Sequence, residues 1–220
     1  MEFTRSVLDH SEKNDFIRIS DRPPRNDIIF RALLFCLLHN TFALSSQRRQ
    51  SVPPSDPQTC LQTSSPNFDL LARYKDSPSS TVPVKVIDVN TVPKVTFSVL
   101  SSCVTCSSNW AYNTLVNGGI LPKSTSNPNL QCVSLSLLEG ESPTFVTRQY
   151  PPPPYPGYCM TANVIDSTGP LVLAGNGRSD LWSLCPNSTA SGRVDVVWSP
   201  KENHAHYLKS NCRDVYLERV

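Results

Sequence analysis

The residues with the clearest potential for chemistry in this 220-residue chain are its eight cysteines. Five of them follow one another at intervals of 26, 27, 26 and 27 residues: Cys106, Cys132, Cys159, Cys185 and Cys212. Together with Cys103 they predict three disulfides in an oxidising compartment, in one of fifteen possible pairings. Cys60 is then the odd thiol, and the sequence leaves its partner open.

The segment Cys103-Val-Thr-Cys106 also allows metal or redox chemistry. A structural zinc site takes four ligands, commonly from two C-x-x-C knuckles, and the chain has no second one. A thioredoxin-like site is expected in a βαβ unit, which the β-rich surroundings do not offer. The sequence therefore favours disulfides as staples and predicts neither a metal nor a cofactor.

Other side chains offer weaker catalytic patterns. His204-Ala205-His206 would place two imidazoles on one face of a strand with Glu202 nearby, but two ligands do not make a metal site, so solvated histidines are the favoured interpretation. Five carboxylates could supply an acid/base pair for glycoside cleavage, although their spacing singles out no pair: Glu139, Glu141, Asp166, Asp180 and Asp195. No G-x-S-x-G nucleophile elbow is present. No catalytic residue is predicted.

Two features are typical of extracellular proteins that carry or bind carbohydrates. Asn187-Ser188-Thr189 is the one complete glycosylation sequon, which predicts a glycan on Asn187. Six aromatic residues could stack on sugar rings: Trp110, Trp182, Trp198, Tyr150, Tyr155 and Tyr158. We assign Trp182 and Trp198 to the core. Tyr155 and Tyr158, in the proline-rich stretch YPPPPYPGY, are the predicted carbohydrate contacts.

The elements that position these residues occupy the second part of the chain. Residues 1–27 are polar and aperiodic, which indicates disorder or an over-long annotated start. Residues 28–43 read IIFRALLFCLLHNTFA, a secretory signal that would be cut after Ala43 and would remove Cys36. Its apolar run is too short to cross about 30 Å of hydrocarbon, so no stable membrane span is expected. Residues 44–66 form a Ser/Pro-rich linker.

Residues 67–220 alternate short apolar runs with turn signals, which predicts an antiparallel β-sandwich, barrel or trefoil-like domain. Asn117-Gly118-Gly119 and 166–169 are expected hairpin turns. The alternation is clearest in three runs, where alternate side chains share one face: Val95/Phe97/Val99, Val133/Leu135/Leu137 and Met160/Ala162/Val164. The expected strands are 68–74, 82–89, 94–100, 132–138, 144–149, 158–165, 171–174, 181–184, 194–198, 206–208 and 215–220.

Composition agrees with this architecture and excludes one class of partner. Twenty prolines against eight glycines, with 17% charged residues, argue against a helical protein. The net charge of +2 creates no field for a polyanion, so nucleic acid is not an expected partner.

The C-terminal half resembles a known family. Leu184-Cys185-Pro186-Asn187, a following glycine, the run 194–198 and Asn211-Cys212 before a terminal apolar strand are similar to the fungal secreted cell-wall proteins typified by the phialide-associated cell-wall protein. Looser matches are 68–72, Cys106 and 117–121, so the likeness covers about residues 67–220. It implies a small, β-rich, disulfide-bonded and often glycosylated protein of the fungal wall or culture medium, without known catalysis. Cys103 and the loop 150–158 depart from the family pattern.

These observations predict a secreted, non-enzymatic protein of the cell wall or extracellular space. A structural or carbohydrate-binding role is expected, with cell-wall polysaccharide or another extracellular glycan as its partner. The alternative is a secreted carbohydrate-active enzyme or a host-directed effector.

Overall fold

The computed structural model describes residues 58–190 and 192–220, and these residues form an all-β, disulfide-stapled domain, which confirms the predicted fold class. One 3-10 turn, η1 (Lys209–Asn211), interrupts the strands. In this part of the chain, no helix has the length and apolar character needed to cross a bilayer. The expected N-terminal extension, the signal sequence and Cys36 lie outside the described residues.

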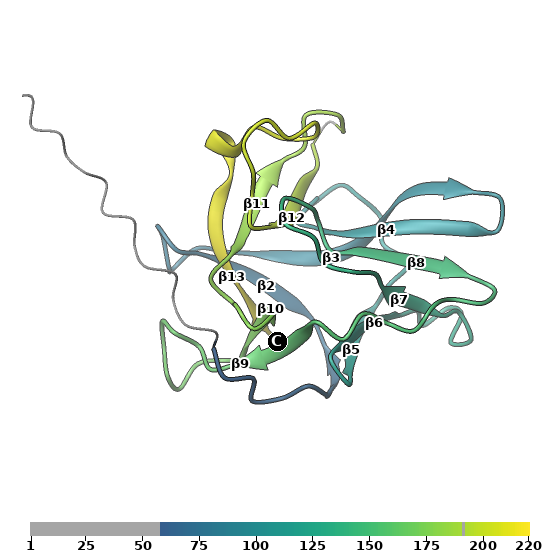
Figure 1. The fold of residues 1–220 in the computed structure, drawn as a ribbon, viewed down its shortest axis with the longest axis horizontal. Coiled ribbons are helices and arrows are strands. Elements are labelled where there is room, and N and C mark those ends of the chain that lie inside the picture. The colour runs from purple at the N-terminus through teal and green to yellow at the C-terminus, as the bar shows by residue number, and fades with distance from the viewer. Residues whose placement is uncertain (1–57, 191) are drawn as a thin grey trace, which may run out of the picture. The chain divides into compact units, whose positions relative to one another are not determined.

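The centre of the fold is a closed six-stranded antiparallel barrel (Figure 1). Each strand pairs with the next, and the last strand, β13, pairs with both β11 and β2, which closes the ring. The order around the barrel is β2 (Leu70–Tyr74), β3 (Thr81–Val92), β4 (Val95–Ser101), β12 (Val194–Trp198), β11 (Trp182–Pro186) and β13 (Arg213–Arg219).

Two short extensions and a second sheet are attached to the barrel. Strand β8 (Thr144–Arg148) pairs with β4 and with β7 (Cys132–Ser134). Strand β10 (Val172–Gly175) pairs with β13 and with β9 (Tyr158–Thr161). A separate three-stranded sheet joins β1 (Ser65–Phe68), β5 (Tyr112–Val116) and β6 (Gly119–Lys123).

Both predicted hairpin turns are present. Asn117 and Gly118 connect β5 to β6 with φ angles of 49° and 80°, the left-handed region that asparagine and glycine tolerate best. A Cβ on Gly118 would lie 2.6 Å from the carbonyl oxygen of Pro156. In the β9–β10 connection, Gly169 N–H donates to the Asp166 carbonyl at 2.9 Å. The sequence did not predict β5 and β6 themselves, because Asn113, Thr114 and Pro122 interrupt the apolar pattern.

The main core contains Trp182 and Trp198, as predicted. Their rings meet edge-on with centroids 4.6 Å apart, and the Trp182 indole Nε1 donates to the Leu173 carbonyl at 2.8 Å. That hydrogen bond is needed because a buried indole N–H without an acceptor would destabilise the fold.

The predicted apolar faces are only partly correct. On β4, Leu100 enters the main core, whereas Val99 packs with Ile87 and Cys103 in a second, smaller cluster. Both faces of this part of β4 are buried, so alternation does not identify the inner one. Strand β9 ends at Thr161, which leaves Val164 exposed, and residues 206–208 are loop instead of the expected strand.

The disulfides correct the predicted cysteine roles. The pairs are Cys60–Cys159, Cys103–Cys106 and Cys185–Cys212, and among the described cysteines the free one is Cys132, not Cys60. Cys132 lies on β7 in the main core, where no other cysteine reaches it.

Cys60 therefore belongs to the domain instead of an independent linker. Next to it, Leu61 N–H donates to the Met160 carbonyl at 2.8 Å, and Gln58 N–H donates to the Gly177 carbonyl at 2.8 Å. The predicted linker boundary at residue 66 is therefore too late, because residues 58–66 already run along the domain. A bridge across about 100 residues stabilises by about 4.7 kcal/mol in a chain-entropy model, against about 2 kcal/mol for the short Cys103–Cys106 ring.

Thiol titration checks this arrangement. Burial raises the pKa of Cys132 to about 12, so its thiol is protonated and inaccessible in the folded protein at pH 8. We expect no reaction of Cys132 with a thiol reagent in the native state. Under denaturing, non-reducing conditions one thiol should appear from residues 58–220, plus one from Cys36 in material that retains it. Three or more thiols would contradict the pairing.

A buried ion pair connects β2 with β13. The Glu218 side chain is 2% exposed and accepts two hydrogen bonds from the Arg73 guanidinium, at 2.7 and 2.8 Å, and one from Asn163 Nδ2 at 2.8 Å. This hydrogen bond with Glu218 raises the pKa of Arg73. The carboxylate depends on these donors because water does not reach it.

Loss of Arg73 should therefore destabilise the barrel strongly. We expect Arg73→Ala to lower the free energy of unfolding by about 2–4 kcal/mol, since it leaves a buried carboxylate with one donor while the guanidinium itself is partly in water. Urea denaturation measures the change. The control is Arg213→Ala, which breaks an exposed pair with Asp76 and should have little effect. Equal losses in the two variants would refute the role of the buried pair.

Candidate functional site

A cavity lined by several charged and polar side chains lies beside the Cys185–Cys212 disulfide. It has a volume of about 190 Å³ and an apolar floor that includes Val89, Val99 and Val197. The polar and ionisable side chains that line it come from four separate segments of the chain: Glu141, Asn187, Arg193, Asp195, His204, His206 and Tyr207. We refer to it as the Asp195 cavity.

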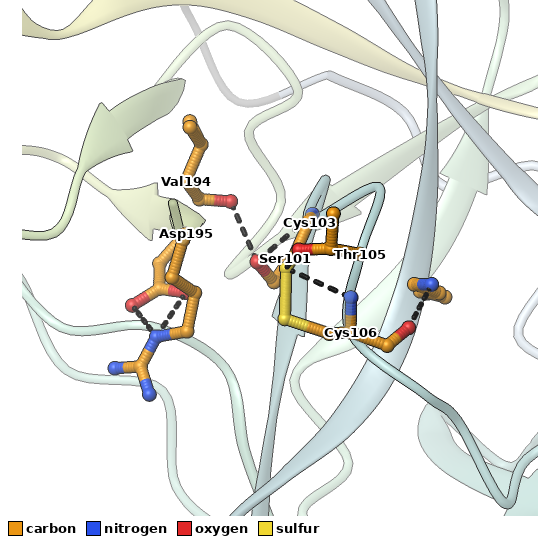
Figure 2. The surroundings of a disulfide bond; sticks show 8 residues. Ser101, Cys103, Thr105, Cys106, Val194 and Asp195 are labelled. Carbon is orange, nitrogen blue, oxygen red and sulfur yellow. Dashed lines mark hydrogen bonds and ion pairs between the residues drawn. A yellow bond between two sulfur atoms is a disulfide. The ribbon is translucent and has the colours of Figure 1, made fainter. Parts of the chain in front are cut away.

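Asp195 provides the buried charge of the cavity. It lies on β12, opposite Cys185 on β11 and Ser101 on β4, so the barrel wall fixes its backbone on both sides. Its carboxylate forms an ion pair with Arg193 Nε at 3.0 Å and accepts a hydrogen bond from Asn187 Nδ2 at 2.7 Å. Figure 2 shows Asp195 beside Val194. These contacts hold the carboxylate in one orientation as an acceptor.

Asn187 follows directly after β11 and connects Asp195 with the rim. Its side-chain Oδ1 accepts hydrogen bonds from Thr189 N–H at 2.9 Å and Thr189 Oγ1 at 2.8 Å, which is an Asx turn. Thr189 Oγ1 lies 3.2 Å from His206 Nδ1. The nitrogen that would carry a glycan donates to Asp195, and glycosylation of Asn187 stays a prediction.

The two histidines lie on the rim, in the loop from β12 to β13. His204 Nε2 is 3.2 Å from Glu141 Oε1, and the His204 ring stacks on Tyr207 with centroids 4.3 Å apart. The two imidazoles lie 5.6 Å apart, centroid to centroid. Glu202, the expected third ligand, instead approaches Lys209 at 3.6 Å. Among the described residues no cluster of three or more metal-ligating side chains is present.

Tyr207 fixes the loop that carries Glu141. Its hydroxyl donates to the Gly140 carbonyl at 2.9 Å and accepts the Lys201 N–H at 3.0 Å. Gly140 has a φ of 84°, and its N–H donates to the Trp198 carbonyl at 2.7 Å. Burial raises the pKa of Tyr207, which keeps the hydroxyl protonated and able to donate. One side chain thus holds the two rim loops together.

The structure brings some predicted site residues together and separates others. Glu141, Asp195 and both histidines share the cavity, whereas Glu139 pairs with Lys201 outside it. Asp166 caps its own turn by accepting from Thr168, and Asp180 pairs with Arg178. Sequence reasoning missed Arg193 and Tyr207, although Arg193 stands two positions before Asp195, the spacing that places both on one face of a strand.

The predicted carbohydrate contact at Tyr158 is wrong. Tyr158 begins β9 and is 1% exposed, so its ring offers no surface to a sugar, and burial raises the pKa of its hydroxyl. Tyr155 is half-buried against Tyr158, with ring centroids 6.1 Å apart, and its hydroxyl donates to Asn176 Oδ1 at 2.8 Å. The exposed aromatic of this loop is Tyr150, at 79%.

The link made by Tyr207 is testable. Tyr207→Phe keeps the ring but leaves the Gly140 carbonyl and the Lys201 N–H without their partner, so we expect a loss of about 1–2 kcal/mol in unfolding free energy. Thermal or urea denaturation measures it. Tyr150→Phe removes an exposed hydroxyl and serves as the matched control, with no expected change. Indistinguishable stabilities for the two variants would show that the Tyr207 hydroxyl does not hold the loops.

Comparison with protein-family models, curated proteins and solved structures finds no match to this chain, so the argument for its function comes from the fold and the Asp195 cavity.

Proposed function

We propose that this protein is a secreted, extracellular β domain that binds a carbohydrate in the Asp195 cavity without cleaving it. The observation that carries the proposal is the lining of that cavity. It combines a buried, oriented carboxylate, an amide, an arginine and two imidazoles over an apolar floor.

Three disulfides support the extracellular part of the proposal. Disulfides persist in oxidising compartments, and cytosolic reductants keep most thiols reduced. Two of the three join segments that are 27 and 99 residues apart, so the fold relies on them for long-range constraint. A wall location is the further expectation that the family resemblance implies.

The chemistry of the cavity fits a neutral, polyhydroxylated ligand. Sugar hydroxyls both donate and accept, and the lining offers acceptors in Glu141 and Asp195 and donors in Arg193 and Asn187. The two carboxylates and one guanidinium leave one net negative charge, which disfavours an anionic ligand. At about 30 Å³ for each water, the cavity holds the equivalent of about six waters, which is close to the size of one sugar ring.

The second candidate function is glycoside hydrolysis, because Glu141 and Asp195 line the same cavity. Hydrolases of this kind place two carboxyl groups on either side of the scissile bond. Against this role, Asp195 is held between Arg193 and Asn187 as a fixed acceptor. A host-directed effector function would use the same extracellular scaffold, and no residue of the cavity favours it specifically.

Binding to glycans tests the proposal. Purified protein is applied to a glycan array and to insoluble wall polysaccharides, and the Kd for the best ligand is measured by calorimetry. We expect Glu141→Gln to weaken binding about 10-fold to 100-fold, because it removes a charged acceptor at the rim. Glu139→Gln is the matched control: it changes another exposed carboxylate two residues away, outside the cavity, and should bind like the parent protein.

The outcomes separate the candidates. Binding that Glu141→Gln weakens and Glu139→Gln spares, with the glycan intact afterwards, supports the proposal. Release of sugar that both Glu141→Gln and Asp195→Asn abolish would replace it with hydrolysis. Failure to bind any glycan, or equal effects of the two glutamate variants, would refute it.

A further inference from the structure

The Cys103–Cys106 disulfide differs from the other two in what it connects. Its cysteines stand three positions apart in the loop that follows β4, while the others join residues 27 and 99 positions apart. A ring this small constrains the unfolded chain less than either of the two longer bridges does. Long-range stapling therefore does not explain why this loop carries a disulfide.

The loop backbone is held by contacts that do not involve the sulfur–sulfur bond. Ser101 Oγ donates to the Val194 carbonyl at 2.8 Å and accepts the Cys103 N–H at 3.3 Å (Figure 2). At the other end of the loop, Ser108 Oγ donates to the Val86 carbonyl at 2.6 Å. The two cysteines therefore stay close together when the bond is broken.

The two cysteines differ in exposure. Cys103 is 2% exposed and packs with Ile87 and Val99, whereas Cys106 is half-buried. Between them Val104 is 87% exposed, and Thr105 is also exposed, so the outer side of the loop faces solvent. A thiol arriving from solution therefore reaches the sulfur of Cys106 first.

The hydrogen bonds favour Cys103 as the leaving group. The Cys106 N–H donates to Cys103 Sγ at 3.1 Å, and the Thr105 hydroxyl lies 3.7 Å from the same sulfur (Figure 2). The Lys85 ammonium donates to the Cys106 carbonyl. Hydrogen-bond donors stabilise a thiolate, and a stabilised thiolate leaves faster in thiol–disulfide exchange.

We propose that Cys103–Cys106 is a thiol–disulfide exchange site that oxidises thiols. The thiolate of a first thiol attacks Cys106 Sγ, the electron pair of the Cys103–Cys106 bond moves to Cys103 Sγ, and a mixed disulfide forms at Cys106. A second thiolate attacks the substrate sulfur of that mixed disulfide and releases Cys106 as a thiolate. Two thiols leave as one disulfide, and their two protons and two electrons remain on the reduced Cys103 and Cys106.

The substrate class is a thiol, either a low-molecular-mass thiol or a cysteine of an extracellular polypeptide. Native protein is incubated in separate arms with reduced glutathione and with a reduced cysteine-containing peptide, quenched in acid, alkylated and mapped by mass spectrometry. We expect Cys103–Cys106 to be reduced at least about tenfold faster than Cys185–Cys212, whose second cysteine is also half-buried. The arm with the faster reaction identifies the source of the thiol.

Two variants test the direction of attack. In Cys103→Ser the accessible Cys106 thiol remains, and we expect it to capture glutathione from glutathione disulfide with release of one reduced glutathione. In Cys106→Ser the buried Cys103 thiol remains and should capture at least about tenfold less in the same time. Simultaneous reduction of all three native disulfides, or equal capture by the two variants, would overturn the proposal.

Discussion

The antiparallel pairing of β13 with two strands at once is the constraint on which the rest of the structure depends. β13 hydrogen-bonds to β2 along most of its length and to β11 at its start, so a linear sheet becomes a closed barrel. Closure removes the unpaired edges that a sheet would otherwise expose. Val215 and Leu217 on this strand are part of the core. Glu218, next to them, forms an ion pair with Arg73 on β2. Among the described strands, β10 pairs with the barrel at β13, and β9 in turn pairs with β10.

Closure of the barrel determines the geometry of the Asp195 cavity. The loop with His204, His206 and Tyr207 leaves the end of β12 and returns at the start of β13, so barrel closure fixes both its ends. The Cys185–Cys212 disulfide ties the second end to β11, and Tyr207 ties the middle to Gly140. Polar groups from distant parts of the chain are therefore held in place before any ligand arrives, which reduces the entropy that binding must overcome.

Local sequence patterns are sufficient to locate the strands, but they do not show which distant residues come together in the fold. Period-two alternation and the Asn117-Gly118 signal depend on neighbouring residues, so they located most strands and both hairpin turns. Glu141 and Asp195 share a cavity although 54 positions separate them, because β12 pairs with β4 and the 139–141 turn packs against Trp198. The even cysteine spacing carries no such long-range information, so it predicts a bridge to Cys132 and leaves Cys60 without a partner, whereas the structure bonds Cys60 and leaves Cys132 free. Tyr158 was misplaced because proline-rich surroundings indicated a rim while the residue itself begins a buried strand.

The disulfide pattern is the most direct test of how the chain is held together, since each pair depends on a different part of the fold. The measurement is peptide mapping by mass spectrometry of purified protein digested without reduction, with free thiols blocked before unfolding. The account predicts linked peptides for Cys60–Cys159 and Cys185–Cys212, an internal Cys103–Cys106 bridge, and Cys132 blocked only after unfolding. A bridge between Cys132 and any other cysteine, or Cys60 free in folded monomer, would contradict it.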